Sequence, residues 1–191
     1  MTKLDPAGLV LVSSSREKLA EFRELGLGID LEPGRDLPEA DSRDAIEVVV
    51  HKALAAGEGR VVEDSSLDVE GAEIGANVRW LAGQLGRDPS LFGKRAVHTV
   101  LLAVFQHGEV RVFRGELDGT VVPERGSGWS FGPSFSPDGS GGLTLAEIEA
   151  LGRKSEFSAR RRAAEAMLAG DCVHRVRAER VPAWKGAWQN A

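Results

Sequence analysis

The start of the chain changes from a strand-like to a helix-like pattern within a few residues, and this constrains the fold more than any other feature. Residues 9–12 are a short apolar run that ends in three serines, Ser13 to Ser15. Apolar residues then recur with the spacing of one helix face: Leu19, Phe22 and Leu25. This order predicts a strand, a polar turn and a helix, which is typical of proteins in which helices cover a sheet.

The middle of the chain predicts a second helix, followed by strands. A helix-like apolar stripe covers residues 44–56, and Asp41 and Ser42 precede it as candidate N-caps. Residues 60–62 and 67–69 have the composition of two strand pieces on either side of a polar stretch. We therefore expect short strands here, separated by a polar connection.

The second half of the chain predicts a hairpin, a long loop and two helices. Residues 97–105 and 110–113 have the pattern of paired strands, which residues 119–122 continue. The stretch 126–142 is rich in Gly, Ser and Pro, and a long loop within a compact domain is typical of a segment that covers a ligand. Thr144 and Glu147 have the spacing of a capping box. The two expected helices are 144–151 and 158–168.

Neither a repeat nor a linker interrupts this order, so we expect one domain over residues 1–191. Its fold class is α/β, with a mixed twisted sheet and flanking helices. A chain of this length buries roughly 70% of its unfolded surface and folds without a metal or a disulfide. The tail 175–191 has no clear period, and its tryptophans, Trp184 and Trp188, could pack on the domain or join an interface.

Composition excludes several classes of protein. The chain has 42% hydrophobic and 28% charged residues, as in ordinary globular proteins. The net charge of −5 argues against broad nucleic-acid binding, which needs an excess of Lys and Arg. The single cysteine, Cys172, excludes an internal disulfide and every cysteine-based zinc site. With no signal-like start and no long apolar run, we expect a cytoplasmic protein that does not contact a membrane.

The turn from Ser13 to Lys18 is a candidate phosphate site. Serine hydroxyls, free backbone N–H groups and a lysine at a helix N-terminus all favour an anion. The alternative is a helix capped by a serine, with Lys18 exposed to solvent. Ser15 and Lys18 also have the Ser-x-x-Lys spacing of some acyl hydrolases, but the companion motifs of those enzymes are missing.

Three acidic residues form a candidate metal site. Glu63 and Asp64 follow a strand-like run, and a loop could bring Glu39 near them. Hard carboxylate oxygens suit Mg²⁺, which completes its shell with phosphates and water. The alternative is that all three are solvated charges at the ends of secondary-structure elements.

Taken in order, these segments resemble the inosine triphosphate pyrophosphatase family, and the resemblance covers roughly residues 8–170. That family cleaves non-standard purine nucleoside triphosphates to a monophosphate and pyrophosphate. The matching segments are the turn 13–18, Leu-Pro-Glu at 37–39, Lys-Ala at 52–53, Glu-Asp-Ser-Ser-Leu at 63–67 and the segment 75–80. The resemblance implies two lobes around a central cleft, a homodimer and a nucleoside triphosphate substrate.

The resemblance also implies roles for individual residues. Mg²⁺ would be held by Glu39 with help from Glu63 or Asp64, and Asp64 would orient and deprotonate the attacking water. The catalytic residues would be Asp64, Glu39 and Lys18. The residues that bind the substrate would be Ser13, Ser15, Lys18, Lys52, Ser65, Trp129, Phe131, Lys154 and Arg160.

The base-binding part departs from the family pattern. The loop at 128–135 has Gly132 where the family has aspartate, and Ala159 stands where the family has histidine. A site that hydrogen-bonds a base discriminates through its own buried polar groups, so these losses predict altered base selection. Trp129 and Phe131 keep aromatic faces for stacking.

Two hypotheses of function follow, with a third considered weaker. The first is Mg²⁺-dependent hydrolysis between the α and β phosphates of a nucleoside triphosphate with a non-standard or modified base. The second is a nucleotide-binding or regulatory protein that has kept the fold and lost turnover, which the departures at Ser13, Ser15, Gly132 and Ala159 favour. A serine acyl hydrolase is the third, and it would leave the acidic residues unexplained.

Overall fold

The computed structural model describes residues 8–34, 36–72 and 85–189 of the chain. The match at residues 75–80 lies outside the described residues. The strands are β1 (Val10–Ser13), β2 (Asp30–Pro33), β3 (Arg60–Val69), β4 (Arg95–Gln106), β5 (Glu109–Val121), β6 (Phe135–Pro137) and β7 (His174–Arg177). The α-helices are α1 (Arg16–Leu25), α2 (Ala45–Ala56), α4 (Leu145–Ala150) and α5 (Ala159–Ala169). Short 3-10 helices are η1 (Pro89–Leu91), η2 (Gly132–Ser134), η3 (Lys154–Phe157) and η4 (Ala178–Arg180).

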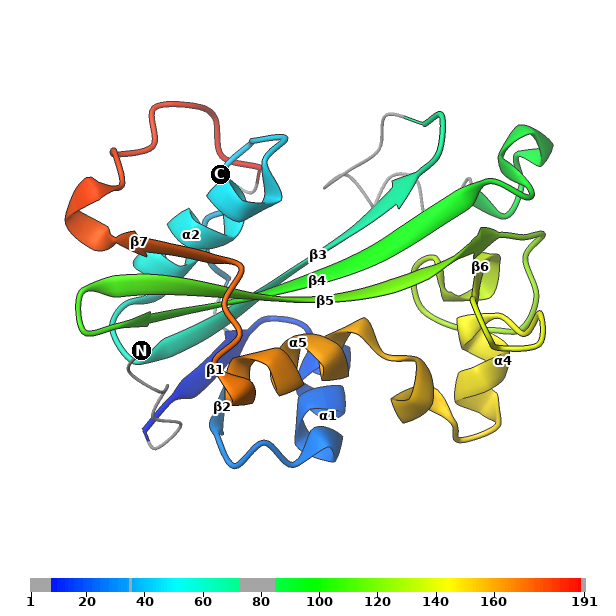
Figure 1. Cartoon of the computed structure of the whole chain (residues 1–191), viewed down its shortest axis with the longest axis horizontal. Helices are drawn as coiled ribbons and strands as arrows, with labels where there is room; N and C mark the ends of the chain where they lie inside the picture. Colours follow the sequence, from blue (N-terminus) through cyan, green and yellow to red (C-terminus); the bar gives the residue numbers. More distant parts are fainter. Residues whose placement is uncertain (1–7, 35, 73–84, 190–191) are drawn as a thin grey trace. The chain divides into compact units, whose positions relative to one another are not determined.

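The strands form one seven-stranded mixed sheet, which confirms the predicted α/β class. Its order is β2-β1-β3-β4-β5-β6, and β7 also pairs with β5. β1 is parallel to β2 and β3, whereas β5 is antiparallel to β6 and β7. β4 and β5 form the predicted hairpin, with His107 at φ 55° and Gly108 at φ 69° in its two-residue turn (Figure 1). A turn with positive φ at both residues has a backbone twist that matches the right-handed twist of the two strands it joins.

The chain divides into two compact units. Unit 1 contains residues 1–64, 100–115 and 160–191, and unit 2 contains residues 65–99 and 116–159. β3, β4 and β5 each contribute residues to both. The single domain over residues 1–191 and the central cleft stay predictions.

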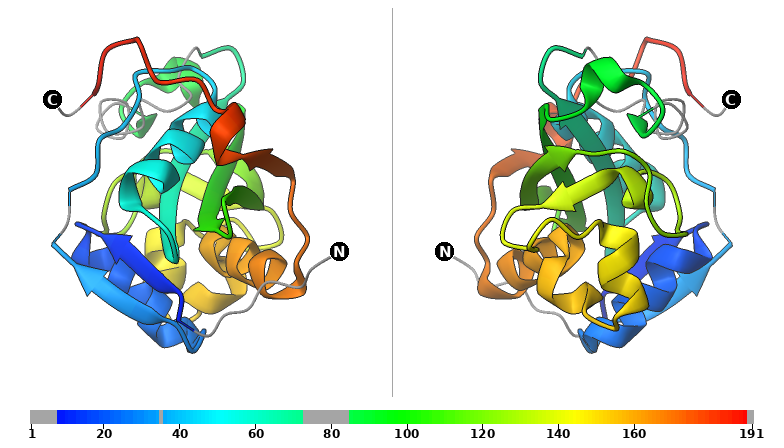
Figure 2. Two further views of the ribbon diagram at one scale, coloured as in Figure 1. Left: turned by 90° about the vertical axis from the view of Figure 1, so that its left-hand side faces the viewer. Right: turned by 90° about the vertical axis from the view of Figure 1, so that its right-hand side faces the viewer.

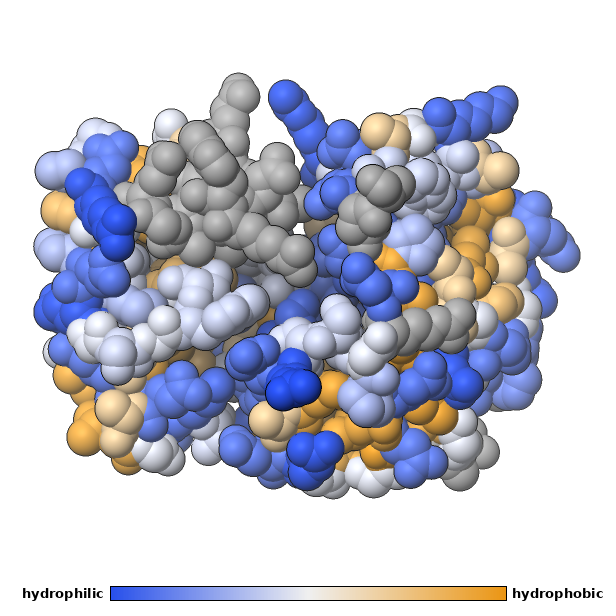
Figure 3. Space-filling model, turned by 180° about the vertical axis from the view of Figure 1, so that it is seen from behind, coloured by the Kyte–Doolittle hydropathy of each residue, from blue (hydrophilic) through white to orange (hydrophobic). Residues whose placement is uncertain are grey.

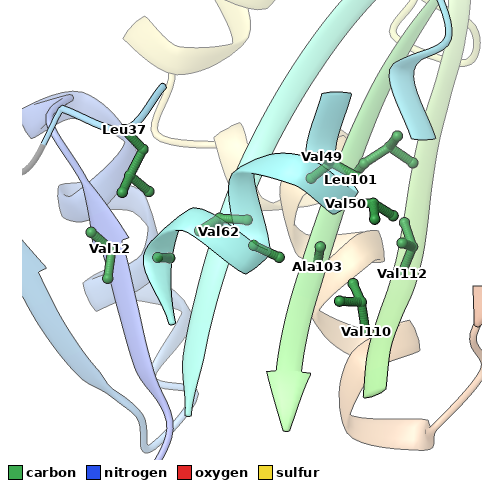
Figure 4. Packing of buried hydrophobic residues seen from close by; sticks show 11 residues of the cluster. Val12, Leu37, Val49, Val50, Val62, Leu101, Ala103, Val110 and Val112 are labelled. Atoms are coloured by element: carbon green, nitrogen blue, oxygen red, sulfur yellow. The ribbon is translucent and has the colours of Figure 1, made fainter. Parts of the chain in front are cut away.

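In unit 1, helices cover both faces of the sheet. α2 lies on one face, whereas α1 and α5 lie on the other (Figures 1 and 2). Val49 and Val50 of α2 pack against strand residues such as Leu101 and Val112, all buried (Figure 4). The apolar stripe at 44–56 thus forms a helix because its buried side covers the apolar side chains of the strands.

Unit 2 contains β6, α4 and the loop around them. Thr144 caps α4, and both hydrogen bonds of the predicted capping box with Glu147 are present. Gly119 in β5 allows β6 to approach, since a Cβ there would lie 2.5 Å from the Ser136 carbonyl oxygen. The β5 to β6 pairing therefore depends on the absence of a side chain at this position.

Three details of the sequence-based assignment are wrong, and one element was not predicted. The N-cap of α2 is Asp44, whose side chain accepts from two backbone N–H groups, and not Asp41 or Ser42. β3 is one continuous strand, so no turn separates its two halves. The stretch 126–142 is not all loop, because it contains η2 and β6. The tail holds part of β7, whose cross-strand pairing with β5 stabilises a segment that lacks a clear period of its own.

The surface agrees with the composition. On the face drawn in Figure 3, hydrophilic residues alternate with smaller apolar groups. Within the described ranges, no helix is both long and apolar enough to cross a membrane. The cytoplasmic location stays a prediction.

Candidate functional site

The turn between β1 and α1 is built as a helix cap. Ser15 has extended backbone angles, and its hydroxyl oxygen accepts a hydrogen bond from the Lys18 backbone N–H at 3.3 Å. The same hydroxyl donates to the carboxylate of Glu17 at 3.0 Å, and Ser13 Oγ accepts from the Ser15 backbone N–H at 3.2 Å. The alternative of a serine cap is thus confirmed. An acyl hydrolase based on Ser15 would use the Lys18 amine as its base, but that amine is paired with the Glu63 carboxylate at 3.1 Å, so the geometry does not support it.

Lys18 is not the exposed lysine of that alternative, because its ammonium joins a buried group of charges. Lys18 Nζ lies 3.1 Å from Glu63 Oε1, and the Glu63 side chain is 1% exposed. The Arg160 guanidinium binds the same carboxylate with two hydrogen bonds, of 2.9 and 3.1 Å, and also donates to Glu21. Arg160 stacks at 5.7 Å from the ring centroid of Phe22. α1, β3 and α5 are thereby joined by one charge network.

The charges in this network are fixed in their ionised forms. Burial favours the neutral form of Glu63, but Arg160 and Lys18 outweigh it and hold the pKa of that carboxyl well below its usual range. Burial likewise opposes the charge of Arg160, and the carboxylates of Glu63 and Glu21 raise the pKa of its guanidinium. Glu63 is therefore a carboxylate whose two oxygens already accept three hydrogen bonds or ion pairs from cationic side chains.

A second group of charges surrounds Lys52, which α2 carries. Lys52 Nζ lies 2.6 Å from Glu39 Oε1, 3.0 Å from the Glu63 carbonyl oxygen and 3.9 Å from Asp64 Oδ1. The side chains of Lys52, Asp64 and Glu39 are 11%, 16% and 24% exposed, so they are half-buried but reach solvent. One ammonium thus holds two carboxylates that are far apart in the sequence.

The carboxyl group of Asp64 has a raised pKa. Burial raises the pKa of Asp64, the ammonium groups of Lys52 and Lys18 oppose this, and the charges of Glu39 and Glu63 add to it. The net shift is upward. A carboxyl group with a raised pKa is a better proton acceptor when ionised, and such groups cluster at functional sites.

The donor set at this position suits a hard cation. Glu39 and Asp64 present carboxylate oxygens toward one positive charge, as they would toward Mg²⁺ with its phosphates and waters. In the part of the chain that the structure describes, no cluster of three or more His, Cys, Asp or Glu side chains has the arrangement of a metal site. Two carboxylates would leave the remaining coordination positions of such an ion to substrate phosphates and water.

Four of the predicted substrate-binding residues belong to unit 2. Trp129 is 58% exposed, whereas Phe131 is 7% exposed and packs edge-on against His98 and Phe135. Lys154 pairs with Glu149 at 2.7 Å. Ser65, in β3, is partly buried. Trp129 thus has a free aromatic surface for stacking, and Phe131 has little.

The two departures from the family pattern have different surroundings. A Cβ at Gly132 would meet its nearest neighbours at 3.9 Å, an ordinary van der Waals contact, so the backbone there has room for a Cβ. Ala159 is 1% exposed at the start of α5, so a larger side chain there would have to be accommodated among buried neighbours.

Comparison with known proteins decides the family. A model of the Ham1 family matches residues 9–170. The chain belongs to the Ham1 family. It is 34% identical to an inosine triphosphate pyrophosphatase of Aspergillus oryzae over 169 residues, which cover 80% of this chain and 87% of that protein. It is 31% identical to a dITP/XTP pyrophosphatase of Korarchaeum cryptofilum over 147 residues, 69% of this chain and 80% of the relative.

Solved structures of Ham1 proteins share the fold. The Staphylococcus aureus Ham1 protein aligns with a TM-score of 0.62 at 20% identity, covering 84% of this chain and 96% of that one. A Ham1 protein from Coxiella burnetii aligns equally well, with a TM-score of 0.62 at 20% identity over 85% and 96% of the two chains. At this identity the likeness supports the fold of the chain alone.

Unit 1 of this Ham1 family member brings together most of the predicted site residues. Lys18, Glu39, Lys52, Glu63, Asp64 and Arg160 form the two connected charge groups, and Ser13 and Ser15 lie in the adjoining turn. Ser65, Trp129, Phe131 and Lys154 belong to unit 2. The roles assigned to all of these residues stay predictions.

Sequence reasoning did not assign a role to Glu21. It is buried and binds Arg160, and it lies three residues after Lys18 on α1. Residues three and four apart share a helix face, so Lys18, Glu21 and Phe22 all point to the same side. An acidic residue within a buried helix stripe was the available signal, because such a residue needs a cationic partner.

Proposed function

We propose that the protein hydrolyses a nucleoside triphosphate to the monophosphate and pyrophosphate with the help of Mg²⁺. The observation that carries this proposal is the meeting of Glu39 and Asp64 at Lys52, beside the buried Glu63 network. The curated relatives are named as pyrophosphatases of inosine, deoxyinosine or xanthosine triphosphate. An enzyme that catalyses this reaction is a hydrolase that acts on acid anhydrides.

In this proposal, the site residues of unit 1 have different roles in the reaction. Asp64 accepts a proton from the attacking water, since its pKa is raised and its side chain reaches solvent. Lys52 and Lys18 hold phosphate oxygens, and Glu63 fixes the position of Lys18. Glu39 and Asp64 would hold the metal. When bound, Mg²⁺ supplies positive charge opposite the phosphate oxygens.

Base selection in this proposal differs from that of the relatives. Gly132 and Ala159 offer no polar side chain to a base edge, whereas Trp129 offers an exposed ring. Stacking tolerates many bases because every base has an aromatic face. We therefore infer a broader or redirected range of bases.

A catalytically silent nucleotide-binding protein is the second candidate. Lys18, Lys52 and Arg160 are all paired with carboxylates of the protein itself, so an incoming triphosphate has to compete for them. Such pairing is compatible with a protein that binds nucleotide without turnover. The retained Glu39 and Asp64 favour the enzyme instead.

Pyrophosphate release tests the two candidates. The assay uses a panel of standard, deaminated and modified nucleoside triphosphates with Mg²⁺, and compares the wild type with Asp64→Asn. Asp68→Asn is the matched control, because Asp68 is an exposed aspartate in the same strand. Turnover that is lost only in Asp64→Asn supports the enzyme. Nucleotide binding without turnover in the wild type would establish the silent protein.

The homodimer also stays a prediction, which rests on the family resemblance. Sedimentation velocity distinguishes a monomer of 20.4 kDa from a particle of twice that mass. A monomer at concentrations well above those of the activity assay would overturn this prediction.

A further inference from the structure

The segment 184–189 binds the backbone around Glu39. The Asp41 N–H donates to the Ala187 carbonyl at 3.0 Å, and the Gln189 N–H donates to the Glu39 carbonyl at 2.9 Å. Ala40 and Trp188 form a β-bridge. The segment is the red end of the chain in Figures 1 and 2, beside the blue stretch that precedes α2. We call it the C-terminal clamp, and it lies beyond the region 9–170 that the family model matches.

Side chains strengthen this contact from both ends of the clamp. The Gln189 side-chain amide donates to the Ala40 carbonyl at 3.2 Å. The Trp184 ring lies 5.5 Å from the ring of His51, the residue before Lys52 in α2. The clamp therefore contacts two of the three segments that build the Lys52 charge group, the stretch around Glu39 and α2.

The clamp has a defined internal structure. Trp184 Nε1 donates to the Ala187 carbonyl at 2.8 Å, and the rings of Trp184 and Trp188 are 6.4 Å apart. A Cβ at Gly186 would lie 2.5 Å from the Trp184 ring, so only glycine fits in this turn. An internally hydrogen-bonded turn of this kind is a specific structure rather than a loose end.

Glu39 belongs to a segment that has no helix or regular strand of its own. Residues 36–44 contain only the isolated bridge residue Ala40, which is fully buried. The carbonyls of Glu39 and Ala40 and the N–H of Asp41 all bond to the clamp. A metal carboxylate must be held close to its productive position. Fixing the backbone of Glu39 limits the positions that its carboxylate can reach, and the ion pair with Lys52 then selects among them.

We propose that the C-terminal clamp positions Glu39 for metal binding, so that residues 184–189 tune the affinity of the site without touching substrate. This proposal rests on the proposed function, in which Glu39 holds Mg²⁺. Partners that orient a metal ligand typically change metal affinity by about 10- to 100-fold when they are removed. We expect the lower end here, because the clamp acts through the backbone.

The test compares three variants in the full-length protein. Gly186→Val opposes the turn of the clamp, and Gln189→Ala removes one side-chain hydrogen bond to Ala40. Lys185→Ala is the matched control, because Lys185 is exposed within the same segment. The measurements are Mn²⁺ affinity of the free protein by calorimetry, the Mg²⁺ concentration that gives half-maximal activity, and kcat at saturating Mg²⁺.

We expect Gly186→Val to weaken Mn²⁺ binding and to raise the Mg²⁺ requirement by about tenfold, with kcat at saturating Mg²⁺ nearly unchanged. Gln189→Ala should show a smaller shift in the same direction, and it covers the case in which Gly186→Val fails to fold. If a folded Gly186→Val protein binds metal with unchanged affinity, the clamp does not position Glu39. If only Gln189→Ala folds, unchanged affinity in that variant leads to the same conclusion. A wild type that neither binds Mn²⁺ nor uses Mg²⁺ would instead overturn the proposed function.

Discussion

Glu63 and Asp64 are consecutive residues of β3, yet their carboxylates contact different helices. Glu63 binds Lys18 of α1 and Arg160 of α5, whereas Asp64 lies beside Lys52 of α2. Successive side chains of a strand point to opposite faces, and α2 covers the face opposite to α1 and α5. The two acids therefore belong to different sets of partners, and their substitution should have different consequences.

Asp64→Asn should remove activity and leave the fold intact. The amide cannot accept a proton from water, and general bases typically contribute on the order of 100- to 10,000-fold in rate. Lys52 keeps its ion pair with Glu39, so the thermal midpoint should change little. Pyrophosphate release and a thermal unfolding curve measure the two effects. Full activity in the variant would remove Asp64 from the mechanism.

Glu63→Gln, unlike Asp64→Asn, should lower the stability of the folded protein. The substitution removes the charge that Lys18 and Arg160 share in a buried site, and breaking such a pair typically costs about 3 to 5 kcal/mol. Urea unfolding gives the free energy of unfolding. Glu156→Gln is the control, since Glu156 forms an exposed pair with Arg153 and its removal should cost much less. Equal losses in both variants would contradict a structural role for the buried network.

The elements of the fold were predictable where one local pattern decides them. The turn after β1, the stripe of α2 and the capping box of α4 all follow from residue spacing. The continuity of β3 could not be predicted from residue spacing, because the polar residues at its centre are typical of a turn. Glu63 is tolerated within a strand only because Lys18 and Arg160, distant in sequence, neutralise it. β7 depends in the same way on a partner strand that its own sequence does not reveal.

The site was predictable in composition but not in geometry. The acids and lysines that meet in unit 1 were identified, mostly through the family resemblance. No sequence pattern contains the distances between these side chains. The sequence therefore could not show that cationic side chains already pair with Glu63, or that Lys52 lies between Glu39 and Asp64. The contact of the tail with Ala40 confirms that the tail packs on the rest of the chain, which the sequence left open.

Gly132→Asp should narrow the range of bases. A Cβ at this position would have its nearest neighbours at 3.9 Å, so the substitution begins without a clash. A carboxylate in the loop that carries Trp129 restores one polar group of the family pattern, and such groups reject bases that leave them unpaired. The ratio of kcat/KM between deaminated and standard purine triphosphates should rise by about tenfold or more. Gly132→Ala is the control, because it adds the Cβ without the carboxylate, and an equal change there would contradict the prediction.

Lys52→Met should make the stability of the protein depend on Mg²⁺. In the wild type, the ammonium lies 2.6 Å from Glu39 and 3.9 Å from Asp64 and offsets their mutual repulsion. Without it, the two carboxylates lack that counter-charge, so the variant should unfold at a lower temperature. An ion that binds the folded state raises its stability by mass action. Saturating Mg²⁺ should therefore recover part of the lost stability. It should raise the thermal midpoint of Lys52→Met more than that of the wild type. Thermal unfolding of both proteins with Mg²⁺ and with a chelator measures this difference. If Mg²⁺ raised both midpoints equally, or neither, the carboxylates at Lys52 would not be the metal ligands.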